Sequence, residues 1–165
     1  MRFRPEHHLE QEEIHACVAA CAGMLRRLRG EAFSEAALME SATASGLPMR
    51  VAAEAVGGTD GHLSPTGLLG WLDLLGSGDR CLIVWVCGPI YVKLCGVQPG
   101  GHPSRHGALA APGDYGAPHA VLLVDADAET VRYFDPWYPA QGQPLSMSRD
   151  DLVEMFMLSV VGVSL

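Results

Sequence analysis

The sequence predicts an α+β domain, with helices in the first half of the chain and antiparallel strands in the second. Between residues 14 and 28, apolar side chains recur at spacings of three and four, which is the period of an amphipathic helix. After about residue 80 the chain changes to short runs rich in β-branched and aromatic residues, which are typical of strands. The stretch "HAVLLVDADAETVRYFDPW" then has the pattern of two strands joined by a tight turn.

Four helices are expected in the first half. The first ends at Gly30 and carries one buried stripe, made of Ile14, Val18, Cys21, Leu25 and Leu28. The other three are expected over residues 34–45, 48–55 and 65–75. Serines at 34 and 64 are suited to cap the second and fourth of these helices, and Pro65 suits a first turn.

The second half is expected to begin with two strands, "RCLIVWVC" and "PIYVKLCGV", broken at Gly88-Pro89. The irregular stretch 98–118 holds four prolines and five glycines, and it is expected to form a long surface loop. A hairpin should follow over 119–135, with its turn near 126–129. A helix capped by Ser148 and extending to Met157, then a closing strand "LSVVGVSL", complete the expected elements.

Length and charge limit the classes of function. A chain of 165 residues is expected to be a single domain, 1–165, which can bury a hydrophobic core without disulfide bonds or metal ions to stabilise it. Nucleic-acid-binding domains are usually basic, whereas this chain has a net charge of −8, so no nucleic acid partner is expected. The longest apolar run, 81–97, is interrupted by Gly88, Pro89 and Lys93, and no membrane insertion is expected. The start shows no export signal, which favours a cytoplasmic protein.

Five cysteines allow three interpretations: metal ligands, core residues or a nucleophile. The odd number and the absence of a signal favour reduced thiols. Cys17 and Cys21 stand four apart on a helix without a second close pair, and His102 and His106 lie in the loop, so no metal and no cofactor are expected. Core filling suits most of the thiols, above all Cys21 at the centre of the buried stripe.

Cys17 differs because it stands at the edge of the stripe, in the first turn of its helix. The dipole and the unpaired N–H groups of a helix start favour the thiolate, which is the nucleophilic form. His119 and Asp135 lie at the two ends of the expected hairpin, which brings a base and its orienting carboxylate together. Gln11 stands six residues before Cys17 and offers a side-chain N–H for an oxyanion.

These residues resemble a known family. Gln11-x5-Cys17, followed by Ala20 and Met24, together with the hairpin stretch that ends in Asp135-Pro136, is similar to the papain-like cysteine peptidases. The closest branch is the double-glycine leader peptidases, which process bacteriocins. The resemblance runs from about residue 8 to 162. It implies a papain-like fold, with N-terminal helices packed on an antiparallel sheet.

The resemblance also implies roles for the site residues. Cys17 would be the nucleophile, His119 the base, Asp135 the residue that orients it, and Gln11 the oxyanion donor. The chain departs from the family in having Ala16-Cys17-Val18 where Asp-Cys-Gly is common. It also has a longer loop before the histidine strand, and no transporter follows in the sequence.

The function expected is therefore a stand-alone thiol peptidase that forms an acyl-enzyme on Cys17. Its expected substrate is a peptide, such as the leader of a ribosomally made natural product, cut after small residues. One alternative keeps the triad and changes the acceptor, giving an acyltransferase, cyclase or deamidase whose partner is an acyl substrate or carrier protein. Another is a non-catalytic binding module of the same fold.

Overall fold

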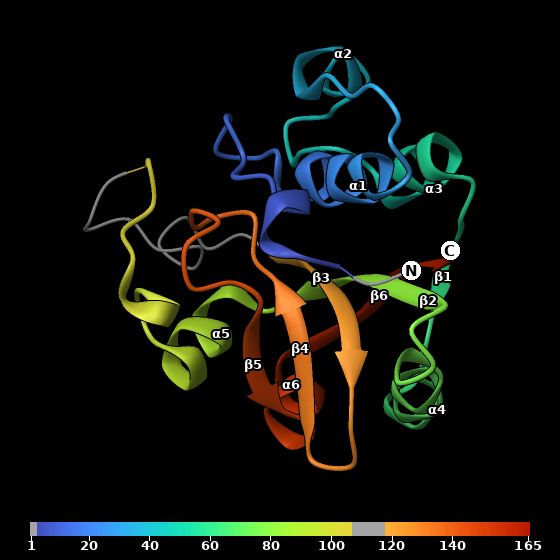
Figure 1. Ribbon diagram of the computed structural model, residues 1–165, viewed down its shortest axis with the longest axis vertical. Helices are drawn as coiled ribbons and strands as arrows, with labels where there is room; N and C mark the ends of the chain where they lie inside the picture. The colour runs from blue at the N-terminus through green and yellow to red at the C-terminus, as the bar shows by residue number, and fades with distance from the viewer. Residues whose placement is uncertain (1–2, 107–117) are drawn as a thin grey trace.

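The computed structural model describes residues 3–106 and 118–165, and its centre is a six-stranded antiparallel sheet (Figure 1). The strand order is β1-β6-β2-β3-β4-β5, so the last strand in the chain lies inside the sheet between the first two. The strands are β1 (Thr59–His62), β2 (Arg80–Val86), β3 (His119–Ala126), β4 (Thr130–Phe134), β5 (Leu145–Ser148) and β6 (Phe156–Ser164).

Helices cover both faces of the sheet. Figure 1 shows α1 and α3 on one side of the strands and α4 and α6 on the other. The α-helices are α1 (Cys17–Leu28), α2 (Glu35–Met39), α3 (Met49–Val56), α4 (Pro65–Leu75), α5 (Gly88–Cys95) and α6 (Arg149–Met155). Two 3₁₀ turns, η1 (Pro5–His7) and η2 (Pro99–Gly101), complete the elements described. No helix in the described residues is long and apolar enough to cross a bilayer.

The sheet separates two hydrophobic clusters because side chains alternate between its faces. On β2, Cys81 and Ile83 pack with α1 and α3, whereas Leu82 and Val84 pack with α4 and α6. The α1 side is unusually close-packed, and every residue from 16 to 25 is buried. Small side chains permit this, since a Cβ on Gly23 would lie 2.5 Å from the Phe33 ring. Helix α1 is therefore a buried helix, and its N-terminus is fixed relative to β3.

The α+β class and most of the expected elements are confirmed. Helix α4 has the expected bounds, and Ser34, Ser64 and Ser148 each accept a hydrogen bond from a first-turn N–H of their helix. Helices α2 and α6 end earlier than expected, and the closing strand β6 begins two residues earlier, at Phe156. The hairpin of β3 and β4 turns at residues 127–129, within the expected stretch.

Two expectations about the elements are wrong, and two strands were not predicted. The run "PIYVKLCGV" forms α5 instead of a strand, because Pro89 suits the first turn of a helix and Tyr91 is buried against the sheet. Ile14 precedes α1 and is 40% exposed, so it does not belong to the buried stripe. Strands β1 and β5 were not expected, since they are short and polar edge strands. In the stretch 98–118, only 98–106 and residue 118 lie among the described residues.

Candidate active site

The N-terminus of α1 places Cys17 beside His119, at the start of the interior strand β3. The helix begins at Cys17 itself, whose side chain is 5% exposed. Because a first-turn amide has no partner within its helix, the Cys17 N–H is available to an incoming group. Cys21 lies one turn further on and is wholly buried, with its thiol 3.8 Å from the Ala120 carbonyl oxygen. Burial raises the pKa of Cys21 well above 9.0, and the nearby charge of Cys17 raises it further.

The β3–β4 hairpin brings His119 and Asp135 together. His119 is the first residue of β3, and Asp135 directly follows β4. His119 Nε2 donates to Asp135 Oδ1 at 2.7 Å, and both side chains are buried, with exposures of 3% and 0%. On its other side the imidazole makes a hydrogen bond with the Cys17 side chain. The described structure thus places His119 between Cys17 and Asp135.

Charge decides the protonation of His119. Burial lowers the pKa of the imidazole, but the Asp135 carboxylate and the Cys17 side chain outweigh burial and raise the pKa to about 10. The imidazole therefore keeps its proton at neutral pH, held between a sulfur and a carboxylate. A protonated imidazole in this position can pair with a thiolate and later give its proton to a leaving group.

Asp135 is held by more partners than the sequence indicated. Its Oδ1 also accepts a hydrogen bond from the Trp137 amide at 2.8 Å, and its Oδ2 accepts one from the Tyr91 hydroxyl of α5. The backbone of Asp135 is fixed as well, because its N–H donates to Gln143 Oε1 at 2.7 Å. Its carbonyl oxygen accepts hydrogen bonds from Gln143 Nε2 at 2.7 Å and from His8 Nε2 at 2.9 Å.

Sequence reasoning missed these supporting residues for different reasons. Trp137 lay in the "DPW" that ends the hairpin stretch, and its ring meets the His119 ring edge to face at 6.3 Å. Tyr91 was placed in a strand, where it would not have pointed at Asp135. No pattern in the sequence indicated Gln143 or His8, which meet Asp135 only in the folded chain.

Gln11 lies in the site, but its amide is engaged elsewhere. Its Nε2 donates to the carbonyl oxygens of Glu13 at 2.9 Å and Ile14 at 2.8 Å. Its Oε1 is buried and has no hydrogen-bond partner among the described residues. The reverse orientation of the amide would place Oε1 against two carbonyl oxygens, so the carbonyls fix the assignment of its atoms. In this arrangement both N–H groups of Gln11 are directed to the backbone.

The segment before Cys17 is held from both sides. Glu35 at the start of α2 accepts the backbone N–H groups of Glu12 at 2.9 Å and Glu13 at 3.0 Å. Burial raises the pKa of Glu35 above its ordinary value of 4.5, in spite of these two hydrogen bonds. The described part of the long loop reaches the segment as well. His106 Nε2 donates to the Gln11 carbonyl oxygen at 3.1 Å, and its ring contacts the Trp137 ring in a tilted arrangement, with the centroids 4.8 Å apart.

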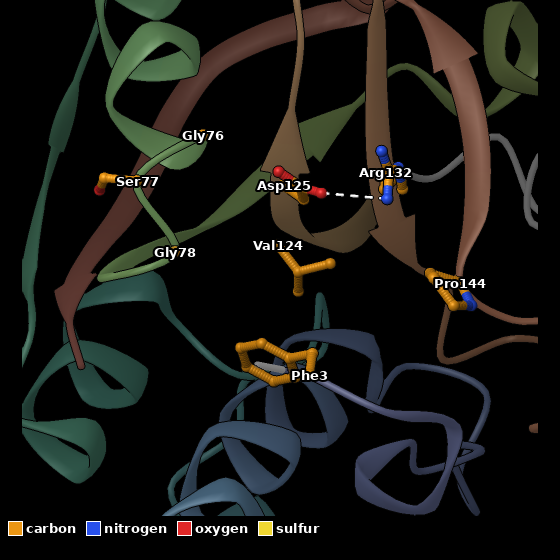
Figure 2. Close-up of a pocket in the computed structure, with 8 residues that line it drawn as sticks. All are labelled: Phe3, Gly76, Ser77, Gly78, Val124, Asp125, Arg132 and Pro144. Carbon is orange, nitrogen blue, oxygen red and sulfur yellow. Dashed lines mark ion pairs between the residues drawn. The ribbon is translucent and has the colours of Figure 1, made fainter. Parts of the chain in front are cut away.

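Two pockets of about 680 Å³ differ in their relation to this site. One is lined by Glu12–His15 and by α2 with the residues after it, so it borders the segment between Gln11 and Cys17. The other is shown in Figure 2, where Asp125 and Arg132 of the hairpin pair at 3.1 Å above Phe3. Neither lining includes Cys17, His119 or Asp135, but only the first pocket borders the segment that leads into Cys17. The first pocket is therefore the better candidate for a substrate cleft.

Metal ligands do not gather in the described residues. No group of three or more His, Cys, Asp or Glu side chains there has the arrangement of a metal site. All five cysteines lie in the described part of the chain, and each is a free thiol. The thiols at 81 and 95 have pKa values raised by burial, that of Cys81 to about 12.

Comparison with solved structures identifies the fold. The peptidase domain of Streptococcus ComA, a bifunctional ABC transporter of a quorum-sensing pathway, matches with a TM-score of 0.60 over 94% of each chain at 14% identity. The chain has the papain-like fold of C39 peptidase domains. A C39-like peptidase from Bacillus anthracis matches with a TM-score of 0.59, over 96% of this chain and 94% of that one, at 11% identity. No family model and no curated protein matches the sequence.

The resemblance to the double-glycine branch, inferred from short motifs, thus agrees with the fold. At identities of 11 and 14%, the likeness concerns the papain-like fold alone. The chemistry has to be argued from the side chains of this chain.

Proposed function

We propose that the protein is a papain-like cysteine peptidase that cleaves a peptide through an acyl-enzyme on Cys17. The observation that carries the proposal is the position of His119, which is hydrogen-bonded to Cys17 on one side and to Asp135 on the other. A nucleophile, its base and the group that orients the base are the three parts that such catalysis needs. The whole chain, 1–165, is proposed to act as one cytoplasmic domain.

In the acylation step, His119 already carries the proton given up by Cys17, and the thiolate sulfur attacks the carbonyl carbon of the scissile bond. The Cys17 N–H at the start of α1 donates to the oxyanion that forms. Gln11 is proposed to add a second donor, which requires its amide to leave the carbonyl of Glu13 or Ile14. The C–N bond then breaks as His119 protonates the leaving amine, and the acyl group stays on sulfur.

In the second step, His119 removes a proton from water and the resulting hydroxide attacks the thioester. The C–S bond then breaks, the acid product leaves and loses its proton to solvent, and the proton that His119 took from water balances the thiolate of Cys17. The Trp137 ring meets the His119 ring edge to face, and it is proposed to keep water from competing for the His119–Asp135 hydrogen bond. An amine, hydroxyl or thiol in place of water would give acyl transfer or cyclisation with the same residues.

The proposed substrate class rests on the pocket that borders the segment before Cys17. Its lining carries Glu12, Glu13, Glu35 and Glu40, and α2 forms one wall. A neutral or basic peptide segment suits this lining better than an acidic one. We propose that the substrate is a precursor peptide, cut after small residues, as expected for the leader of a ribosomally made natural product.

The test combines thiol labelling with turnover. Iodoacetamide at pH 7 is expected to label Cys17 before the other four thiols, since burial disfavours the thiolates of Cys21, Cys81 and Cys95. Peptide mass spectrometry identifies the site. Cys17→Ala should abolish cleavage of a peptide panel, while Cys21→Ala, one turn further along α1, should keep it.

The products separate the alternatives. A free carboxylate indicates hydrolysis, a new amide or ester indicates acyl transfer or cyclisation, and an acid formed from a side-chain amide indicates deamidation. Labelling led by another cysteine, or full activity of Cys17→Ala, would overturn the proposal. Binding of a peptide without turnover and without preferential labelling of Cys17 would identify a binding module.

A further inference from the structure

Asp135 is linked by hydrogen bonds to groups that pack on both faces of the sheet. Through His119 it is linked to Cys17 on α1, which packs on one face of the sheet. Its other oxygen, Oδ2, accepts the hydroxyl of Tyr91, which belongs to α5 and to the hydrophobic cluster on the opposite face. The carboxylate is therefore fixed from both sides of the sheet.

The Tyr91 hydroxyl has the properties of a permanent donor. The side chain is wholly buried, and burial followed by the charge of Asp135 raises the pKa of Tyr91 well above its ordinary value of 10. The hydroxyl consequently keeps its proton over the whole range in which His119 titrates. A carboxylate can only accept hydrogen bonds, so the single proton of Tyr91 is directed to Asp135.

A second tyrosine supports this direction. The hydroxyl oxygens of Tyr91 and Tyr133 lie 3.3 Å apart, and the Tyr91 hydroxyl already donates its hydrogen bond to Asp135. Tyr91 can then only accept in this pair, and Tyr133, whose hydroxyl also has a hydrogen bond with the Cys95 side chain, is its only possible donor. Donation by Tyr133 polarises the Tyr91 hydroxyl and strengthens its bond to the carboxylate. Tyr133 itself does not touch Asp135 through a hydrogen bond that the structure describes.

We propose that Tyr91 is a positioning residue, whose hydroxyl holds Asp135 Oδ2 and so fixes the orientation in which His119 meets Cys17. This role rests on the proposed function of Cys17 and His119. Without the hydroxyl, Oδ2 is left in a buried site without that donor, and the carboxylate is free to turn about its side-chain torsion. His119 would then lose part of the contact that keeps it protonated.

The test follows the rate at which iodoacetamide modifies Cys17 as a function of pH, which requires no substrate. Tyr91→Phe is expected to lower the rate at pH 7 roughly tenfold, as for the loss of one hydrogen bond to a charged group. It should also move the alkaline limb of the profile, where His119 loses its proton, to lower pH. A purely structural role would lower the melting temperature and leave that limb in place.

Tyr133→Phe is the matched control, because it deletes a hydroxyl from the same buried cluster and leaves the donor to Asp135 intact. It should move the limb less than Tyr91→Phe does. An equal shift in both variants, or an unmoved limb in Tyr91→Phe, would overturn the role of Tyr91. If the wild-type chain labels another cysteine first, the proposed function fails, and this result is distinct from the failure of Tyr91.

A measurement on the unchanged chain does not depend on the folding of a variant. With ¹³C-labelled tyrosine, the Cζ resonance of Tyr91 should change with the same midpoint as the loss of the His119 proton, because its hydroxyl is bonded to the partner of that imidazole. The resonance of Tyr138, whose hydroxyl donates to the Val97 carbonyl, serves as the reference. A Tyr91 resonance that does not respond at that midpoint would contradict the proposal.

Discussion

Asp135 and Gln11 are the two wholly buried polar side chains of the candidate site, and they differ in how completely their polar atoms are hydrogen-bonded. Both oxygens of Asp135 accept hydrogen bonds from groups on three different parts of the chain. Gln11 has its Oε1 without a partner in the described structure and its Nε2 directed to the carbonyls of its own segment. A buried polar atom without a partner costs roughly 1–3 kcal/mol, so the state of Gln11 is held at a cost.

This difference separates two tasks of the site. In the proposed mechanism, the His119 side must be ready before substrate arrives, since it sets the charge of Cys17, and the fold holds its hydrogen bonds complete. The oxyanion side is needed only when an oxyanion exists. A Gln11 amide bonded to Glu13 and Ile14 is set for rearrangement, because turning toward an oxyanion exchanges backbone carbonyls for a stronger, charged acceptor.

The largest effect is expected from Asp135→Asn. The variant removes the charge that raises the pKa of His119, so burial, which lowers it, is no longer opposed. The new amide also faces the donors Tyr91, Trp137 and His119 with one acceptor oxygen instead of two. Turnover should fall by roughly 10²–10⁴, measured with the peptide found in the cleavage screen.

The pH profile of Cys17 alkylation makes this prediction specific. In the wild-type chain the alkaline limb should lie near pH 10, and in Asp135→Asn it should move toward pH 6.5 or below. Asp125→Asn is the control, since this carboxylate lies on the same hairpin but pairs with Arg132 at 3.1 Å. An alkaline limb that stays near pH 10 in Asp135→Asn would show that another group keeps the proton on His119.

A smaller and different effect is expected from Gln11→Ala. If the Gln11 amide donates to the oxyanion, turnover should fall by roughly 10²–10³ through kcat, as for the loss of one oxyanion donor. Alkylation of Cys17 by iodoacetamide should keep its rate, because displacement at a saturated carbon forms no oxyanion. The comparison of the two rates therefore isolates the oxyanion role.

Gln141→Ala is the control for loss of an amide, since Gln141 is exposed. Should turnover and alkylation fall together in Gln11→Ala, the amide would be a brace for the segment before Cys17 and not an oxyanion donor.

The same contrast explains how far the sequence predicted the site. Cys17, His119 and Asp135 carry strong local signals, because a helix start and the two ends of a hairpin can be located from the pattern of apolar residues. The position of Gln11 was predicted as well, but the direction of its amide depends on carbonyls whose geometry no pattern contains. The contact of Tyr91 was not predicted because α5 was assigned as a strand. A short apolar run does not distinguish a helix from a strand.

The fold was predictable to a similar degree. Capped and periodic segments such as α4 and the β3–β4 hairpin were located closely. The short edge strands β1 and β5 were not, because they owe their conformation to their neighbours β6 and β4. The supports of the site, from Glu35 to Gln143, come from segments far apart in sequence, and such contacts follow only from the folded chain.

The smallest effect is expected from a substitution of Glu35, which accepts hydrogen bonds from the segment between Gln11 and Cys17. In the folded chain, burial raises the pKa of this carboxyl group above its ordinary value of 4.5. An acid with a raised pKa binds more protons folded than unfolded, so the free energy of unfolding should decrease as pH rises from 4.5. Glu35→Gln removes this slope and retains an oxygen for one of the two N–H groups. The change at pH 7 should be about 1 kcal/mol or less, measured by urea unfolding at several pH values.

Glu40→Gln is the control, because it changes an exposed glutamate just after α2 and should leave the slope in place. A slope that persists in Glu35→Gln would assign the pH dependence to another carboxyl group, and Glu35 would then hold the segment by its hydrogen bonds alone.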